Sequence, residues 1–283
     1  MTISSVPALW AIAAQETVTT FGPAAMPAAL PKTTRMIAIT ATRHPHDVGF
    51  TVAPAPTCRA WPGRDTLRPT LNRPGSFEPD LYFGDMSLDA FARLGTGVEP
   101  WLSFEKARAF VAEGNLPQAR ATLESIALMP TIESRFRLQA WHSLREAGGQ
   151  PPASVAMDVL GVIVEVDMSK GQDFLATYAD QTAYYYNYSG ASVVWLRPDA
   201  SLDGQINSAL SAARVILPLI GDPWKEPRRP PPSAGNARLN ILTAMGLHFG
   251  EGPLRALDRD RHAQPLLRAA TALMAKLTKL PRR

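Results

Sequence analysis

His248 and Glu251 stand among three glycines in residues 246–253, directly after a predicted strand. Imidazole and carboxylate side chains can exchange protons with a substrate, and glycine lets a ligand approach the backbone closely. The chain contains no glycine-rich phosphate loop of the nucleotide-binding types. Two interpretations stay open: a tight turn from strand to helix, or the pocket of an enzyme or small-molecule sensor in which His248 and Glu251 are the candidate catalytic residues.

His44, His46 and Asp47 form a cluster of metal-capable side chains, and Cys58 is the single cysteine. Two histidines two residues apart on a strand would point the same way, but Pro45 places them in a predicted turn. The residues around Cys58 match no nucleophile signature. We therefore predict an exposed turn and an idle or buried thiol, with no metal site and no cofactor.

Residues 182–196 carry four tyrosines and a tryptophan on what their alternation predicts to be a β-hairpin. A two-residue turn at 189–190 predicts that one face of the hairpin carries Tyr184, Tyr186, Tyr188 and Trp195. Tyrosine keeps a polar tip that prefers water or a partner group. Three roles stay open for this face: stability of the sheet, binding of a partner protein, or binding of a small ligand.

A basic proline-rich segment, DPWKEPRRPPPSAGNA, occupies residues 222–237 and contains Arg228 and Arg229. Polyproline II chain with arginines suits recognition by the groove of another protein, and it can also contact phosphate. A solvated loop is the alternative interpretation. We predict that Arg228 and Arg229 contact a protein partner.

The composition places the chain among globular proteins, with 46% hydrophobic and 19% charged residues over 283 positions. The net charge of +4 is small and spread along the chain, which argues against nucleic-acid binding. The first basic residue is Lys32, so the charged region of a signal peptide is missing. With one cysteine and no apolar stretch of ~20 residues, we expect a cytoplasmic protein without disulfides or membrane spans.

Residues 150–283 predict an α+β domain, in which an antiparallel sheet has helices packed on one face. The predicted strands are 157–166, 174–180, 182–188, 191–196, 238–244 and 247–249. Apolar side chains repeat with the helical period over 202–220 and again over 262–280.

Residues 1–100 predict a proline-rich N-terminal region with a β-hairpin. Eleven of the 26 prolines precede residue 80. Alternating apolar residues at 37–41 and 48–52 flank a turn, which predicts the hairpin. The proline density of residues 53–80 blocks helices and central strands and therefore predicts extended chain.

Residues 101–149 predict three short helices that bridge the two other regions. Breaks fall at Gly114, at Pro130 and at the glycines of 148–149. Small, aromatic and aliphatic residues fall at the offsets of a tetratricopeptide repeat: Ala107, Phe110, Gly114, Ala119, Leu123 and Ile126. The segment thus resembles a tetratricopeptide-like helical hairpin, although Ser103 stands at the expected tryptophan position and Pro130 comes one position early.

Extended proline-rich segments and a wet aromatic face, without a polar catalytic cluster, favour a non-catalytic interaction or adaptor protein. Its contact sites would be the helical hairpin, the tyrosine-rich face and the proline-rich segments, and its partner would be another protein. The alternative is an enzyme or small-molecule sensor with a pocket near His248 and Glu251.

Overall fold

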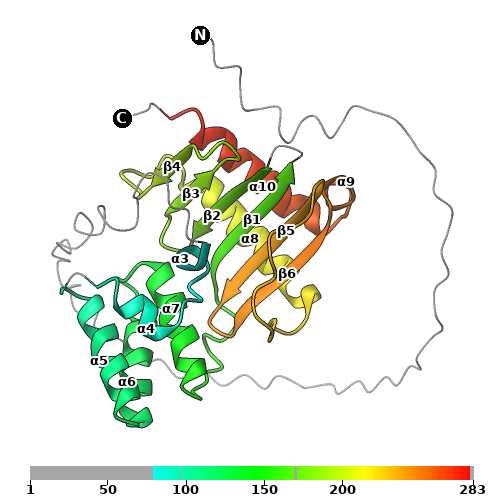
Figure 1. Ribbon diagram of the computed structural model, residues 1–283. Helices are drawn as coiled ribbons and strands as arrows, with labels where there is room; N and C mark the ends of the chain where they lie inside the picture. Colours follow the sequence, from blue (N-terminus) through cyan, green and yellow to red (C-terminus); the bar gives the residue numbers. More distant parts are fainter. Residues whose placement is uncertain (1–78, 96, 169–170, 281–283) are drawn as a thin grey trace, which may run out of the picture. The chain divides into compact units, whose positions relative to one another are not determined.

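The computed structural model describes residues 79–95, 97–168 and 171–280 (Figure 1). The hairpin predicted at 36–52, the metal-capable cluster at 44–47 and Cys58 lie outside these residues, so what was expected of them stays a prediction. The described residues belong to one compact unit. Within them, none of the helices combines the length and the apolar character that crossing a membrane requires.

An antiparallel sheet of six strands lies at the centre of this unit, in the order β4-β3-β2-β1-β5-β6. The strands are β1 (Val159–Met168), β2 (Gly171–Tyr178), β3 (Ala183–Tyr186), β4 (Ser192–Trp195), β5 (Asn236–Thr243) and β6 (Gly246–Pro253). The predicted α+β class with an antiparallel sheet is confirmed. The last strand is longer than expected, because β6 pairs with β5 along its whole length.

Two helices, α8 (Asp203–Ile220) and α10 (Ala263–Leu277), cover one face of the sheet, and the short α9 (Leu254–Leu257) precedes α10 (Figure 1). Ile206 and Leu210 of α8 lie four positions apart and therefore project from one side of the helix. They share a hydrophobic core with Val162 and Val164 of β1. This is the helix placement that the sequence predicted for the C-terminal region.

The helices that precede the sheet in sequence are α3 (Pro79–Phe83), α4 (Leu88–Ala92), α5 (Trp101–Ala112), α6 (Leu116–Leu128) and α7 (Ser134–Glu146). Of these, α3 and α7 lie against the opposite face of the sheet, whereas α6 packs on α7, α5 on α6 and α4 on α5. Ile163 of β1 and Phe174 of β2 share a core with Trp101 and Trp141 of these helices. The three helices predicted for residues 101–149 are confirmed. The expected extended chain is wrong at its end, because α3 begins at Pro79.

The turn between β3 and β4 has three residues rather than the predicted two. The backbone N–H of Asn187 donates to the carbonyl oxygen of Ala191 over 2.9 Å, and Tyr184 pairs with Val194 instead of Trp195. A register shift of one residue moves every side chain of a strand to the other face. Trp195 therefore lies on the face opposite to Tyr184, and the predicted register and single aromatic face are wrong.

Gly84 brings the loop after α3 against the middle of α7. Its φ of 65° is in the left-handed region, and an added Cβ would lie 2.8 Å from Cβ of Leu138 and 2.9 Å from the backbone nitrogen of Gln139. The side-chain amide of Gln139 also binds the backbone N–H and carbonyl of Met86, at 3.2 and 2.7 Å. The loop is therefore held closely against α7 at this point.

We expect Gly84→Ala to lower the free energy of unfolding by about 3 kcal/mol, because the methyl group meets the backbone of α7 and the φ is strained. Gly114→Ala is the matched control: its φ is 74°, but an added Cβ meets nothing within 4 Å. Gly114→Ala should lower the free energy of unfolding by roughly 1 kcal/mol, because only the left-handed backbone conformation is then unfavourable. Urea denaturation of the full chain measures both, and equal losses would contradict the close approach of the loop to α7.

Candidate functional site

His248 and Glu251 do not share a pocket. Successive residues of a strand alternate between its faces, and β6 separates these two by three positions, so their side chains leave opposite faces of the sheet. His248 is buried, and its ring nitrogens lie 3.0 Å from the carbonyl oxygen of Gly221 and 3.3 Å from the hydroxyl of Thr243. The prediction that both side chains line one site is wrong.

The aromatic residues of the predicted partner surface are mostly buried. Tyr184 is 1% exposed and belongs to the core with α3 and α7, whereas Trp195 is 6% exposed and belongs to the core with α8 and α10. Tyr186 is half-buried, and its hydroxyl hydrogen-bonds to that of Tyr82 in α3. Tyr188 alone of the four predicted residues is exposed. This burial favours stability of the sheet among the three roles left open.

The proline-rich loop, residues 221–235, is attached to the rest of the unit by Arg228. Its Nε donates to Oδ2 of Asp85 over 2.8 Å, and its Nη2 forms an ion pair with Asp80 of α3. Arg228 is therefore engaged inside the unit rather than free for a partner. Arg229 keeps an exposed surface, so of the two predicted contact residues it is the accessible one.

Arg238 of β5 holds the other end of this loop. Its guanidinium donates to the carbonyl oxygens of Arg229 and Pro230 at 3.3 and 2.8 Å. The carboxylates of Glu165 at 3.5 Å and Glu251 at 2.8 Å form ion pairs with it. Proline has no backbone N–H, so the carbonyl groups of a proline-rich loop need donors from elsewhere. The buried Arg238 supplies two of these donors and fixes the loop on the sheet.

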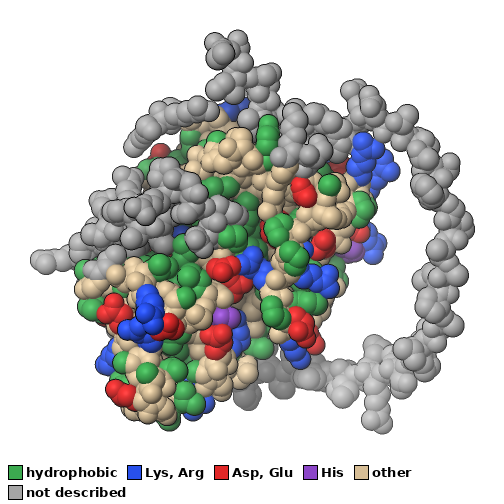
Figure 2. All heavy atoms as spheres, in the orientation of Figure 1, with side chains coloured by type: hydrophobic (Ala, Val, Ile, Leu, Met, Phe, Trp, Pro, Cys, Tyr) green, Lys and Arg blue, Asp and Glu red, His purple; other side chains and the backbone are tan. Residues whose placement is uncertain are grey.

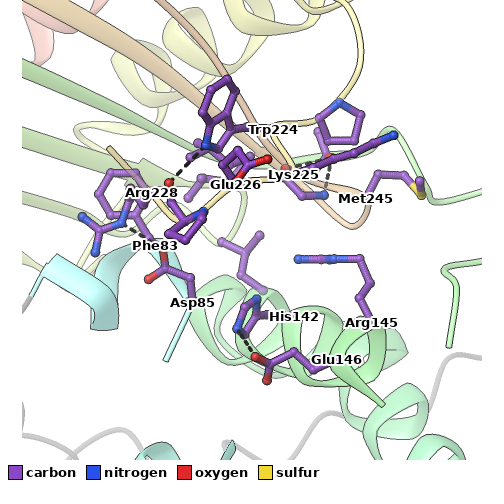
Figure 3. A pocket seen from close by; sticks show the side chains of 18 of the residues that line it. Phe83, Asp85, His142, Arg145, Glu146, Trp224, Lys225, Glu226, Arg228 and Met245 are labelled. Carbon is purple, nitrogen blue, oxygen red and sulfur yellow. Dashed lines mark hydrogen bonds and ion pairs between the residues drawn. The ribbon is translucent and has the colours of Figure 1, made fainter. Parts of the chain in front are cut away.

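A cleft of about 690 Å³ opens between α7, the loop after α3, the proline-rich loop and the turn between β5 and β6 (Figure 3). Volumes of roughly 300–1,000 Å³ accommodate small organic molecules. Charged side chains of both signs line it, and Figure 2 shows acidic, basic and histidine side chains close together near the centre of this face. Neither His248 nor Glu251 lines this cleft.

Helix α7 positions His142 and Arg145, which lie three residues apart and therefore project into the cleft from one side of the helix. At the start of α7, the backbone N–H of Ser134 donates to the carboxylate of Asp180, between β2 and β3, over 2.8 Å. Near its end, Arg145 donates to the carbonyl oxygen of Ala244 in the β5–β6 turn. These two contacts fix α7 on the sheet at both ends.

Arg145 carries a charge that no carboxylate of the described residues pairs within ion-pair distance; its hydrogen-bond acceptor there is the carbonyl of Ala244. Burial lowers the pKa of Arg145 to about 10, although the charge of Glu146 acts in the opposite direction. A partly buried cation without a counter-charge is unfavourable in a folded protein. An anion in the cleft would supply the counter-charge that Arg145 lacks among the described residues.

Asp85 lies in another wall of the cleft. Its Oδ1 is buried and finds no hydrogen-bond donor among the described residues, while Oδ2 accepts from Arg228. Burial raises the pKa of Asp85, and the guanidinium of Arg228 opposes that change. Next to it along the cleft, Nε2 of His142 lies 3.4 Å from Oε1 of Glu146. The cleft thus combines a guanidinium without an anion and a carboxylate oxygen without a donor.

Sequence reasoning missed these residues. The one available signal is the spacing of His142 and Arg145 in the last turns of a predicted helix, and such spacing is also typical of a solvated helix face. Asp85 and Arg228 lie 143 residues apart, so no local pattern joins them. Across residues 79–280 as far as the structure describes them, no group of three His, Cys, Asp or Glu side chains could hold a metal ion.

Comparison of the chain with protein-family models, with curated proteins and with solved structures finds no match. The resemblance of residues 101–149 to a tetratricopeptide-like hairpin therefore stays a prediction.

The buried His248 makes a testable contribution to pH dependence. Desolvation lowers its pKa below the ordinary value near 6.5, and the hydrogen bond to Gly221 opposes this. At pH values just below 6.5, His248 therefore carries a proton in the unfolded chain but not in the folded chain. The stability contributed by the neutral ring is present above about pH 6.5 and is lost as the pH falls toward the folded-state pKa.

We expect the free energy of unfolding to fall between about pH 7.5 and about pH 5, and His248→Gln to show a smaller fall. His262→Gln, in the last turn before α10, is the matched control and should keep the wild-type slope. Urea denaturation at several pH values measures the three slopes. An unchanged slope in His248→Gln would show that burial does not keep this ring neutral.

Proposed function

We propose that this protein binds a small organic anion in the cleft beside α7, as a small-molecule sensor or an enzyme. The observation that carries the proposal is Arg145, a half-buried guanidinium that lines a cleft and has no carboxylate within ion-pair distance among the described residues. Strongly perturbed ionisable groups in a cleft are typical of functional sites. The proposal keeps the class of function that the sequence analysis gave as its alternative and moves it away from His248 and Glu251.

The other walls of the cleft support an organic ligand. Apolar side chains line the same cleft as Arg145, among them the half-buried Leu247 and the edges of the buried Leu138 and Leu242. Binding sites for small molecules combine such surface with a few polar groups that orient the ligand. Arginine binds carboxylate and phosphate through two parallel N–H groups, which suits either kind of anion.

The test is the affinity of simple anions for the full chain, with acetate, butanoate, hexanoate and inorganic phosphate as probes. We expect at least one probe to bind in isothermal titration calorimetry and Arg145→Gln to weaken it by roughly 10- to 100-fold, because a charge-assisted hydrogen bond is lost. Arg214→Gln is the matched control, since Arg214 is exposed on α8 against the opposite face of the sheet. Binding of no probe, or equal binding by Arg145→Gln, would overturn the proposal.

A second candidate is the non-catalytic adaptor that the sequence favoured, now confined to the helical hairpin of α5 and α6. Large exposed hydrophobic side chains concentrate in and beside these helices: Val98, Leu102, Val111, Leu116, Leu128 and Met129. Scattered apolar residues are normal on a surface, but a concentration of them is typical of protein contacts. The tyrosine-rich face and Arg228 no longer support this candidate, because they are engaged inside the unit.

The adaptor candidate predicts a partner that depends on the hairpin surface. A tagged full-length chain should retain one protein in stoichiometric amount, and Leu116→Ser with Leu128→Ser should release it while the thermal unfolding midpoint stays within a few degrees. Arg145→Gln serves as the control and should retain the partner. Retention by the double variant would exclude the hairpin as the contact site.

A further inference from the structure

The two ends of the cleft differ in charge: two carboxylates gather at one end, whereas a guanidinium lies at the other end, beside Glu146. At one end, the carboxylates of Asp80 and Asp85 share the single guanidinium of Arg228, which leaves an excess of one negative charge among these three groups. At the other end stands Arg145, without a paired carboxylate among the described residues. In Figure 3, Asp85 and Arg145 lie on either side of His142.

The acidic end can accept a further donor. Asp85 has an oxygen with no hydrogen-bond donor among the residues that the structure describes, and a buried oxygen in that state is unfavourable. Asp80 is half exposed, with 51% of its side chain accessible, and it lines the cleft. A ligand cation can therefore reach Asp80 directly, whereas Oδ1 of Asp85 lies buried behind it and acts on the cation through its charge.

The distance between the acidic end of the cleft and Arg145 follows from the length of α7 that lies between them. The loop that carries Asp85 touches α7 at Leu138, where an added Cβ at Gly84 would lie 2.8 Å from Cβ of Leu138. Arg145 follows Leu138 by seven residues, which corresponds to roughly 10 Å along a helix axis. Apolar surface lies in the same cleft, from Leu138 itself and from Leu247. This order fits a ligand with charged ends and an uncharged middle.

We propose, building on the anion-binding function above, that the ligand is a small zwitterion with well-separated charges. Its carboxylate or phosphate binds the guanidinium of Arg145, and its protonated amine binds at Asp80 and Asp85. Chain-like molecules with an amine at one end and an acid at the other, including short peptides, belong to this class. An extended tripeptide spans about 10 Å, which matches the separation of the two ends.

The test uses pairs of probes that differ in the amine alone: 6-aminohexanoate against hexanoate, with glycine as a zwitterion too short to reach both ends. Isothermal titration calorimetry on the full chain should show 6-aminohexanoate binding about tenfold more tightly than hexanoate and glycine. Asp80→Asn should remove this advantage. Asp203→Asn, which alters an ion-paired carboxylate on α8, is the matched control.

The outcomes separate this inference from the proposed function. Equal binding of 6-aminohexanoate and hexanoate, lost in Arg145→Gln, would overturn the zwitterion and leave anion binding standing. An amine advantage that survives both Asp80→Asn and Asp85→Asn would overturn the assignment of the acidic end. If no probe binds, the proposed function fails together with the inference. Thermal unfolding of each variant verifies that it is folded.

Discussion

The structure depends on a central strand that is apolar on both faces. Val162 and Val164 of β1 enter the core with α8 and α10, whereas Leu160 and Ile163 enter the core with the preceding helices. A strand of this kind has to be covered on both sides, because burying each aliphatic side chain stabilises the fold by roughly 1.5–3 kcal/mol. The helices at 101–146 are therefore part of the packing of the sheet rather than a spacer beside it.

The second face is apolar at one end and polar at the other, and this change creates the cleft. Ile163 packs against helices, but two positions along β1 the side chain of Glu165 pairs with Arg238 under the proline-rich loop. A loop of this composition cannot fill an apolar core, because its carbonyl groups need donors. Helices cover the first part and the loop covers the second. The space where these two covers meet is the cleft.

The sequence was sufficient for elements whose signal is local. The β-branched run at 157–166 predicted the central strand, and the helical period over 202–220 predicted α8. Tyr184 and Trp195 were misplaced because a three-residue turn changes the register by one, and residues 188–190 do not specify the turn length. The cleft escaped prediction for another reason: the contact of Asp85 with Arg228 joins residues 143 positions apart.

The three arginines of α7 differ in how their charge is matched. Arg135, in the first turn, lies 2.9 Å from Glu133 and places its guanidinium 4.5 Å over the ring of Tyr184, so its charge is matched within the protein. Arg145, in the last turn, lies in a cleft and has a backbone carbonyl as its acceptor among the described residues. Arg137, between them, donates to the backbone carbonyl of Ala127 over 2.9 Å and likewise has no carboxylate within ion-pair distance among the described residues. Burial lowers the pKa of Arg137 as it lowers that of Arg145, so the feature that distinguishes Arg145 is its position in the wall of the cleft.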